Sequence, residues 1–403
     1  MSGVALIVAL PALVYYLWAS VELYDGALFV PTWDTLRRLP APTPTSLAIY
    51  LGWFAFHSLM QLYAPGRIVL GAPLADGTRL PYKLNGWLTW WVTWALLAGG
   101  VGLGVFRAAF VAEQLGPLFS TVNLLVYPFA LFLYFHGKRH PDEGRAERTG
   151  DALYDYCMGT SLNPRTGSFD WKLFCEARPG LIGWVVLDVA LAARQHELHG
   201  SVSTPMLLVC AFHFWYVADY YFHEEAILTT WDIKHENFGF MLAWGDLAWV
   251  PFTYTLQARY LLHHHEHEMS TVAVVGVVLL NLAGYLIFRG SNIQKHRFRQ
   301  DAARPVWGRA PEYIRTRTGS LLLTSGWWGV ARHMNYLGDL MMGLAWCVPT
   351  GFGRIVPYFY IIYFTVLLVH RERRDGHACQ RKYGPDWDAY CARVRWRIVP
   401  GLY

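Results

Sequence analysis

Ten long apolar stretches recur along this chain, and they constrain its fold more than any other feature. They lie near residues 3–20, 46–64, 87–106, 117–136, 180–194, 203–222, 238–258, 271–288, 338–353 and 355–369. A membrane hydrocarbon core about 30 Å thick needs roughly 20 apolar residues per helix. Charged residues make up 16% of the chain, against about 25% in soluble globular proteins. The sequence therefore predicts an all-α integral membrane protein with about ten transmembrane helices, and it excludes soluble, disordered and disulfide-rich classes.

The seventh stretch, residues 238–258, is predicted to be a broken helix. It contains Trp244, Gly245, Asp246 and Pro251. Irregular backbone at membrane depth is tolerated only where it is buried in protein or lines a cavity. We therefore expect this segment to line a cavity.

The basic residues indicate how the chain crosses the membrane. With ten spans both termini lie on one side, and that side carries most of the 34 Lys and Arg residues. The basic residues on the opposite side are Arg37, Arg38, Arg107, Arg194, Arg259 and Arg354. Cytoplasmic loops are enriched in Lys and Arg, so we expect both termini in the cytoplasm, in a bacterial inner membrane or in the endoplasmic reticulum or nuclear envelope. Basic residues in loops beside anionic lipid account for the net charge of +5, so the charge does not indicate nucleic-acid binding. Nothing in the sequence indicates an obligate protein partner.

Cysteine and histidine patterns predict neither disulfides nor a metal centre. The six cysteines show no C-x-x-C pairing, so we expect reduced thiols and a chemistry-bearing side that faces a reducing compartment. The run from His263 to Glu268 reads HHHEHE. Consecutive histidines cannot all face one ion, so a surface loop is favoured, with adventitious metal binding as the alternative.

Polar residues concentrate in two segments of the last third of the chain. Residues 325–340 read SGWWGVARHMNYLGDL, and residues 366–391 read VLLVHRERRDGHACQRKYGPDWDAYC. Arginine binds phosphate through paired N–H groups, and neighbouring aromatic rings can stack on a nucleotide ring. The segments predict a nucleotide pocket on the cytoplasmic side of the C-terminal half, without a P-loop or dinucleotide fingerprint. The alternative is basic anchoring on anionic lipid, although anchoring does not need Asp, Asn, Tyr and Trp interleaved so densely.

Two longer motifs carry a family resemblance. Gly150 to Arg165 reads GDALYDYCMGTSLNPR, which matches G-x-x-[LIVM]-[YH]-D-x-[FYI]-x-G-x-x-L-N-P-R except for Cys157 at the aromatic or Ile position. Leu367 to Cys391 matches a second motif throughout. On these motifs the sequence resembles the sterol reductase family of polytopic membrane enzymes, most of all the Δ14-sterol reductases and the membrane domain of lamin B receptor. The resemblance extends from about residue 120, so we expect N-terminal transmembrane helices over residues 1–110 and a catalytic region with a C-terminal NADPH-binding part over residues 111–403.

The resemblance implies NADPH-dependent reduction of a sterol double bond. Matching positions imply the residues that bind NADPH: Lys295, Arg299, Trp328, His333, Asn335, Tyr336, Asp339, Arg371, Asp375, Lys382 and Tyr390. Among these, Lys295, Arg299 and Arg371 can supply charge for the 2′-phosphate and pyrophosphate. Asn335 can hydrogen-bond a carboxamide or ribose.

The segment from Phe214 to Leu261 differs between subfamilies of sterol reductases. Its EEAILTT and FGFMLA pieces look closer to Δ14-reductases, which implies saturation of the carbon 14–carbon 15 double bond; a Δ7-sterol reductase of the 7-dehydrocholesterol type is the alternative. A helix-packing region is the other interpretation of the segment, yet ionisable residues inside a membrane are costly without a role. We expect the sterol to enter from the bilayer near Trp244 to Tyr254. The predicted sterol contacts are Asp219, Glu225, His235, Trp244, Asp246 and Tyr254.

Reduction of an isolated alkene also needs a proton donor. Tyr216 is uncharged at neutral pH and lies three residues before Asp219, so the two can share a helix face. Asp375 is the rival, because desolvation can raise the pKa of a carboxyl group, but neighbouring arginines favour its ionised form. We therefore predict that Tyr216 donates the proton and that Asp375 positions NADPH or relays a proton.

Two other function classes stay open from the sequence. A membrane methyltransferase acting on isoprenylated cysteine has an Arg-His-x-x-Tyr-x-Gly region that resembles residues 332–338, but it lacks the block from Asn163 to Arg165. The other class is a non-catalytic sterol-binding protein. An activity assay would discriminate among the three classes. A sterol reductase would oxidise NADPH with a Δ14-sterol, a methyltransferase would transfer a methyl group, and a non-catalytic sterol-binding protein would do neither.

Overall fold

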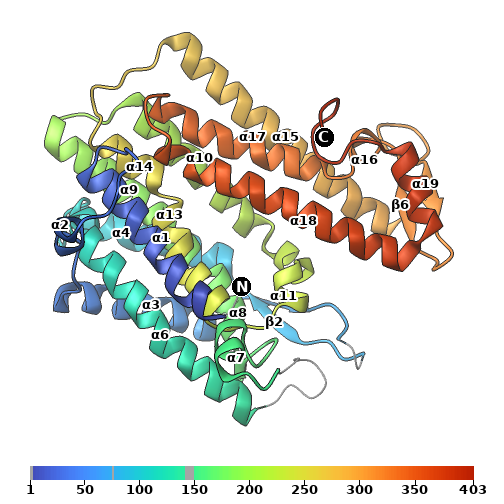
Figure 1. Cartoon of the computed structure of the whole chain (residues 1–403), viewed down its shortest axis with the longest axis horizontal. Coiled ribbons are helices and arrows are strands. Elements are labelled where there is room, and N and C mark those ends of the chain that lie inside the picture. Colours follow the sequence, from blue (N-terminus) through green and yellow to red (C-terminus); the bar gives the residue numbers. More distant parts are fainter. Residues whose placement is uncertain (1–2, 75–76, 141–148) are drawn as a thin grey trace. The chain divides into compact units, whose positions relative to one another are not determined.

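The computed structural model describes residues 3–74, 77–140 and 149–403. This part of the chain is mostly helical, with three short two-stranded sheets (Figure 1). It divides into two compact units, Met1–His267 and Glu268–Tyr403. Each unit has buried apolar clusters of its own.

Long helices make up most of the first unit: α1 (Gly3–Leu23), α3 (Pro44–Tyr63), α4 (Gly86–Gly102), α6 (Leu115–Arg139), α9 (Pro179–His199) and α10 (Thr204–Phe222). Local sequence sets several of their ends. The Thr43 side chain accepts a hydrogen bond from the Ser46 N–H, and Pro44 fills the first turn of α3, where no partner for its nitrogen is needed. Gly200 ends α9 with a φ of 76°, a left-handed conformation that favours glycine. Shorter helices lie in the connections: α2 (Trp33–Arg37), α5 (Phe110–Glu113), α7 (Ala152–Met158), α8 (Trp171–Ala177), the 3-10 turn η1 (Glu224–Thr229) and α11 (Trp231–His235).

The predicted break in the seventh span is confirmed. Helix α12 (Phe240–Trp244) continues into a π-helical turn, η2 (Gly245–Trp249), and then into α13 (Val250–Thr253) and α14 (Leu256–Leu262). The π turn brings the Asp246 carbonyl against α9, where a Cβ on Gly180 would stand 1.9 Å from that oxygen. Only glycine fits this approach. Such π turns inside helices are frequent at functional sites.

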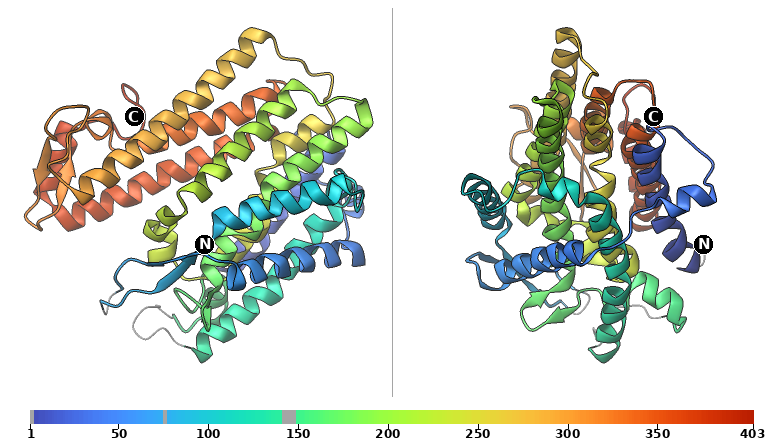
Figure 2. Two further views of the ribbon diagram at one scale, coloured as in Figure 1. Left: turned by 180° about the vertical axis from the view of Figure 1, so that it is seen from behind. Right: turned by 90° about the vertical axis from the view of Figure 1, so that its left-hand side faces the viewer.

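The second unit is built on α15 (Thr271–Gln300), α17 (Met334–Cys347) and α18 (Phe359–Tyr383), which run side by side (Figures 1 and 2). Helices α15 and α17 approach closely, because a Cβ on Gly338 would stand only 2.5 Å from the Gly284 carbonyl oxygen. Small residues allow such contacts between membrane helices. The remaining helical pieces are α16 (Trp327–Val330), η3 (Val348–Thr350), η4 (Val356–Tyr358) and α19 (Pro385–Arg393).

The strands form three antiparallel hairpins in the connections. The pairs are β1 (Arg67–Leu70) with β2 (Pro81–Leu84), β3 (Arg165–Thr166) with β4 (Phe169–Asp170), and β5 (Tyr313–Arg315) with β6 (Leu321–Leu323). The expected all-α class therefore holds for the long elements but not for these connections.

Among the described residues, three helices are long and apolar enough to cross a membrane: Ala5–Leu23, Leu115–Arg139 and Thr271–Gln300. They coincide with the first, fourth and eighth predicted spans. Helices also lie over the other predicted spans, but the ten-span topology and the cytoplasmic termini stay predictions. The functional division at residue 110 also stays a prediction, while the boundary between the compact units falls after His267.

Candidate functional site

The second unit brings a lysine and a tryptophan of the predicted nucleotide set together at the end of α15. The Lys295 Nζ lies 3.7 Å from the centre of the Trp328 ring. Trp328 is buried and its Nε1–H donates to the Ser291 carbonyl at 2.9 Å, so the ring is held in place. Arg299 follows one turn later on α15 and is exposed. Two cations at the end of one helix suit a phosphate group.

A second contact joins the start of α17 to α18. The His333 ring stacks on Tyr336, with 4.7 Å between ring centres and 17° between planes. The Tyr336 hydroxyl lies 3.5 Å from Oδ2 of Asp375. Beside them, the Asn335 amide oxygen is buried without a hydrogen-bond partner in the part of the chain that the structure describes. A buried acceptor of this kind costs free energy until a donor reaches it, so it fits the carboxamide of a nicotinamide ring.

Burial and charge set the protonation of this cluster. Burial, with Lys295, Arg332 and Arg371 nearby, lowers the pKa of His333 to about 3, so its ring is neutral at physiological pH. Burial raises the pKa of Asp375 above its usual value, although Arg371 and Arg374 act in the opposite direction. The arginines favour the ionised form of Asp375, as expected, and desolvation of the carboxyl group is the larger influence on its pKa.

The other predicted cofactor residues take separate positions. Lys382 is exposed, 5.0 Å from the Tyr383 ring. Tyr390, on α19, is buried and stacks on Trp387 with ring centres 5.0 Å apart. Asp339 is half-buried on α17. Their roles toward a cofactor stay predictions.

The last residues of the chain make a contact that sequence reasoning missed. Glu372, next to Arg371, is buried, and one of its carboxylate oxygens accepts from the Arg397 guanidinium and the Tyr403 hydroxyl, both at 3.1 Å. The His333 N–H donates to the Arg397 carbonyl at 2.9 Å. Residues 394–403 are thereby held against α18 and the start of α17. An acidic residue set among arginines was the available signal.

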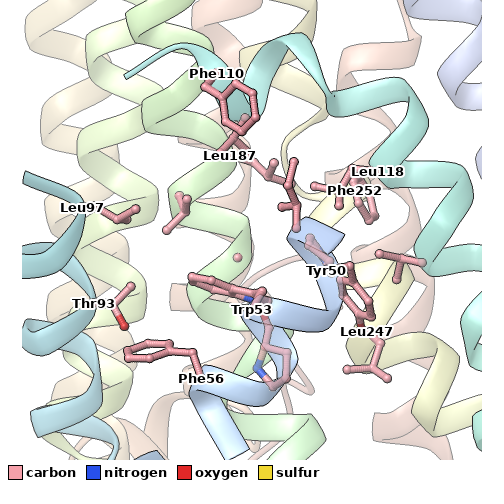
Figure 3. Close-up of a pocket in the computed structure, with 18 of the residues that line it drawn as sticks. Tyr50, Trp53, Phe56, Thr93, Leu97, Phe110, Leu118, Leu187, Leu247 and Phe252 are labelled. Atoms are coloured by element: carbon pink, nitrogen blue, oxygen red, sulfur yellow. Dashed lines mark hydrogen bonds between the residues drawn. The ribbon is translucent and has the colours of Figure 1, made fainter. Parts of the chain in front are cut away.

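The first unit contains an apolar cavity of about 390 Å³ between its long helices (Figure 3). Its walls come from α3, α4, α5, α6 and α9 and from the interrupted seventh span. Among the described residues, no charged side chain lines it. Leu247, Pro251 and Phe252 contribute from the segment predicted to contact the sterol.

The histidine run is a loop, as predicted, but it is tied to the end of α1 and to the turn that follows it. His263 lies 3.1 Å from the Glu22 carboxylate, and His264 lies 2.7 Å from that of Asp25. No group of three or more metal-binding side chains gathers within residues 3–74, 77–140 and 149–403. All six cysteines are free thiols.

Comparison with known proteins identifies the family. A profile described as the ergosterol biosynthesis ERG4/ERG24 family matches residues 3–403. The chain belongs to this family. It is 53% identical to the Δ14-sterol reductase of Methylotuvimicrobium alcaliphilum, over 100% of this chain and 95% of that protein. It is 46% identical to the Δ14-sterol reductase of Dictyostelium discoideum, over 98% of this chain and 88% of that protein.

A 7-dehydrocholesterol reductase, from Xenopus laevis, is 39% identical over 100% of this chain and 92% of that protein. The resemblance to sterol reductases is therefore confirmed. It also extends further than expected, because the ERG4/ERG24 match begins at residue 3.

The motif from Gly150 to Arg165 has a packing role in this member of the ERG4/ERG24 family. The Tyr82 hydroxyl donates to Oδ1 of Asn163 at 3.2 Å. Gly159 has a φ of 100°, and a Cβ there would stand 2.5 Å from the Phe238 backbone. The motif thus packs against β2 and against the segment before α12.

Three of the predicted sterol contacts lie at the end of α10 and beyond it. Asp219 lies 3.3 Å from the His223 ring nitrogen. Glu225 pairs with Arg67 at 3.2 Å on the surface. His235 lines a separate polar cavity of about 650 Å³. None of the three lines the apolar cavity.

The other three predicted contacts lie along the interrupted span. The Trp244 indole donates to Oδ1 of Asn123 at 2.9 Å. The Asp246 backbone packs on α9, and the Tyr254 ring lies 5.1 Å from that of Trp184. These three also lie outside the lining of the apolar cavity, so the six residues are not brought to one place. Ionisable residues in the sequence do not indicate this cavity, because no charged side chain among the described residues lines it.

The predicted proton donor lies near a buried ionisable pair that was missed. The Tyr216 ring centre is 6.2 Å from that of Trp184, which also contacts His213. His213 Nδ1 lies 2.8 Å from Oδ2 of Asp188, and both side chains are fully buried. An aspartate in the fifth predicted span and a histidine in the sixth were the available signal.

Proposed function

We propose that this chain is a Δ14-sterol reductase, which saturates the carbon 14–carbon 15 double bond of a sterol intermediate with NADPH as the reductant. The observation that carries the proposal is the identity to two proteins named Δ14-sterol reductase, at 53% and 46%, against 39% to a 7-dehydrocholesterol reductase. The EEAILTT and FGFMLA pieces within residues 214–261 point the same way.

NADPH as the cofactor is supported by the polar cluster of the second unit. The buried Asn335 amide oxygen would accept a hydrogen bond from the carboxamide, and Lys295 with its neighbours would supply charge for the 2′-phosphate and pyrophosphate. When bound, NADPH supplies the hydride. The full set assigned to it is Lys295, Arg299, Trp328, His333, Asn335, Tyr336, Asp339, Arg371, Asp375, Lys382 and Tyr390.

The chain itself must supply the proton that the alkene takes up. An alkene is a very weak base, so the donor must be held protonated and aimed at one carbon, with water excluded. We assign donation to Tyr216, whose phenol is uncharged at neutral pH. Asp375 positions NADPH or relays a proton, and its raised pKa makes it a stronger rival than its neighbouring charges suggested.

The sterol is proposed to reach the protein from the bilayer, near Trp244 to Tyr254. The proposal places the chain in a bacterial inner membrane or in the endoplasmic reticulum or nuclear envelope, as a multi-pass protein with cytoplasmic termini. In this proposal the chain is surrounded by membrane lipid, and it requires neither nucleic acid nor an obligate protein partner.

The test is a product assay with the purified full chain. NADPH and equal amounts of a Δ14-sterol, a Δ7-sterol and a Δ24(28)-sterol are supplied in parallel, and the products are identified by mass spectrometry. We expect the Δ14-sterol alone to be reduced, with one NADPH oxidised per double bond. Conversion of 7-dehydrocholesterol to cholesterol with the Δ14-sterol untouched would favour a Δ7-reductase instead.

A further inference from the structure

The second unit has a separate pocket at the end of α15, next to a tight turn that follows the helix. Its volume is about 300 Å³. Part of its lining is firmly packed, because Phe298 and Val306 belong to a buried apolar cluster. Two tryptophans, Trp307 and Trp327, also line it, with 5.3 Å between ring centres and 80° between ring planes. We call this space the Trp307 pocket.

The backbone of Trp307 is strained. The Val306 N–H donates to the Arg309 carbonyl at 2.8 Å and the Arg309 N–H donates back at 3.1 Å, so Trp307 and Gly308 form a two-residue turn. Their φ angles are 51° and 76°. Turns of this kind favour Asn-Gly, because positive φ is costly for a bulky side chain. The Trp307 side chain is nevertheless 61% exposed, and strain of this kind is often found at ligand clamps.

Two arginines supply the charge of the pocket. Arg297 and Arg304 both line it and both are exposed. In the described part of the chain, neither forms an ion pair with a carboxylate. Arg297 is two residues from Lys295 and from Arg299 on α15, and residues two apart do not share a helix face. The Trp307 pocket therefore lies on another side of α15 from these predicted NADPH contacts.

The pocket lies at the depth expected for lipid headgroups. Helix α15 is long and apolar enough to cross a membrane, and no charged residue lies between Thr271 and Phe288. At 1.5 Å per residue this stretch spans about 27 Å, close to a hydrocarbon thickness of about 30 Å. The lining residues of α15, from Gly290 to Phe298, follow it directly. Tryptophan and arginine at this level are typical of contacts with the membrane interface.

We propose that the Trp307 pocket binds the headgroup of an anionic phospholipid. Arg297 and Arg304 pair with its phosphate, since guanidinium groups bind phosphate oxygens through paired N–H groups. The rings of Trp307 and Trp327 lie against the glycerol and the first carbons of the acyl chains. A soluble anion would use the arginines alone and gain nothing from the two rings. The proposal goes beyond sterol reduction and requires only that α15 crosses the membrane.

The first test measures lipid binding to the full chain in detergent by native mass spectrometry. Phosphatidylglycerol, which carries a net negative charge, and phosphatidylcholine, which carries none, are titrated separately. The wild type should bind its first phosphatidylglycerol at least tenfold more tightly than its first phosphatidylcholine. The double variant Arg297→Gln/Arg304→Gln should lose this preference.

A matched double variant controls for the change in net charge. Arg315→Gln/Arg381→Gln removes the same charge at two exposed arginines of the second unit that do not line the pocket. It should keep the preference for phosphatidylglycerol. Equal preference in the two double variants, or no preference in the wild type, overturns the proposal.

Two competitors separate a lipid site from other anion sites. Saturating NADPH should leave the affinity for phosphatidylglycerol unchanged, because Lys295 and Arg299 lie on another side of α15. Excess glycerol 3-phosphate, which has the phosphate but no acyl chains, should not displace the lipid. Displacement by NADPH would assign Arg297 to the nucleotide site, and displacement by glycerol 3-phosphate would indicate a site for soluble anions. Either result overturns the proposal.

The last test uses the strained turn. Trp307→Asn removes the ring and gives the turn the Asn-Gly pair that it favours, so the midpoint of thermal unfolding should stay the same or rise. The affinity for phosphatidylglycerol should fall about tenfold, because the ring contact is lost. Trp33→Asn, at a tryptophan of the first unit that is 67% exposed, should leave the affinity unchanged. Unchanged lipid affinity in Trp307→Asn, whatever its midpoint, overturns the proposal.

Discussion

The apolar cavity of the first unit and the polar cluster of the second differ in the kind of side chain that forms them. Among the described residues, no charged side chain lines the cavity. The cluster stacks Lys295 on Trp328 and holds Asp375 beside Tyr336. Burial of apolar area is non-directional, whereas charged and hydrogen-bonded contacts depend on individual atoms. Ligand binding in the first region should therefore depend on the volume of the side chains that line it. Ligand binding in the second region should depend on single functional groups.

The two regions also differ in how they are assembled. Apart from Lys295 on α15, the residues of the cluster lie within residues 325–340 and 366–391, and so it is visible as two motifs. The cavity takes one or a few residues from each of several helices. The predictions below test the contrast, beginning with the largest effect.

The largest effect is expected from removing one hydroxyl. Tyr216→Phe keeps the ring and should lower turnover by about 10²–10⁴, the range for losing a general acid, with NADPH and sterol still bound. Single-turnover product formation measures it, and Tyr63→Phe, at a tyrosine that is 78% exposed, is the control. Near-normal turnover would transfer the role to Asp375 or to a bound water.

The next effect concerns the stability of the first unit alone. The Arg178 guanidinium is fully buried and lies 2.6 Å from the Glu224 carboxylate, which also accepts from the Gly86 N–H at 2.8 Å. Glu224→Ala should lower the free energy of unfolding by about 3–5 kcal/mol, because it leaves a buried charge unpaired. Denaturant unfolding in detergent measures this.

Glu225, the residue after Glu224, provides a matched control. The Glu225 carboxylate pairs with Arg67 on the surface, with both side chains more than half exposed. Glu225→Ala should change the free energy of unfolding by about 0–1 kcal/mol. Equal unfolding midpoints for the two variants would mean that the Arg178 pair does not stabilise the unit. NADPH affinity should stay unchanged in both, since the cofactor residues belong to the second unit.

The third effect concerns nucleotide binding. Arg371→Gln should weaken NADPH binding by about 1.5–3 kcal/mol, the range for hydrogen bonds to charged groups. Arg381→Gln, at an exposed arginine on the same helix, should leave the affinity close to that of the wild type. Isothermal titration calorimetry measures both. Unchanged affinity in Arg371→Gln would remove that residue from the site.

The smallest effect is a change in the pH profile. Because the pKa of Asp375 is raised, its carboxyl keeps its proton to a higher pH than an ordinary aspartate, and turnover that depends on that proton falls as pH rises through the raised pKa. Asp375→Asn should abolish this limb. His333→Gln should leave the profile between about pH 5 and 8 unchanged, since the pKa of His333 is about 3. A profile that moves in His333→Gln but not in Asp375→Asn would reverse the two roles.

Much of the fold could be predicted because its signals are local. Apolar runs of membrane length predicted helices where helices are found, and Gly245 with Pro251 predicted the interruption that the π turn makes. A nucleotide site could be predicted because Lys, Arg and aromatic residues crowd into short segments. The pairing of His213 with Asp188 and the clasp on Glu372 were not readable, because each joins segments far apart in the sequence.

By itself, the sequence determined the helical class, the family and the set of charged residues available to bind a nucleotide, because these depend on composition and on neighbouring residues. Only the tertiary structure decided which buried polar atoms find partners. It gives partners to Thr93 and Trp53, whereas the Tyr50 hydroxyl and the Asn335 amide oxygen have none among the residues that the structure describes. The reason is that a hydrogen bond requires two atoms within about 3.5 Å, and the packing of distant helices sets that distance.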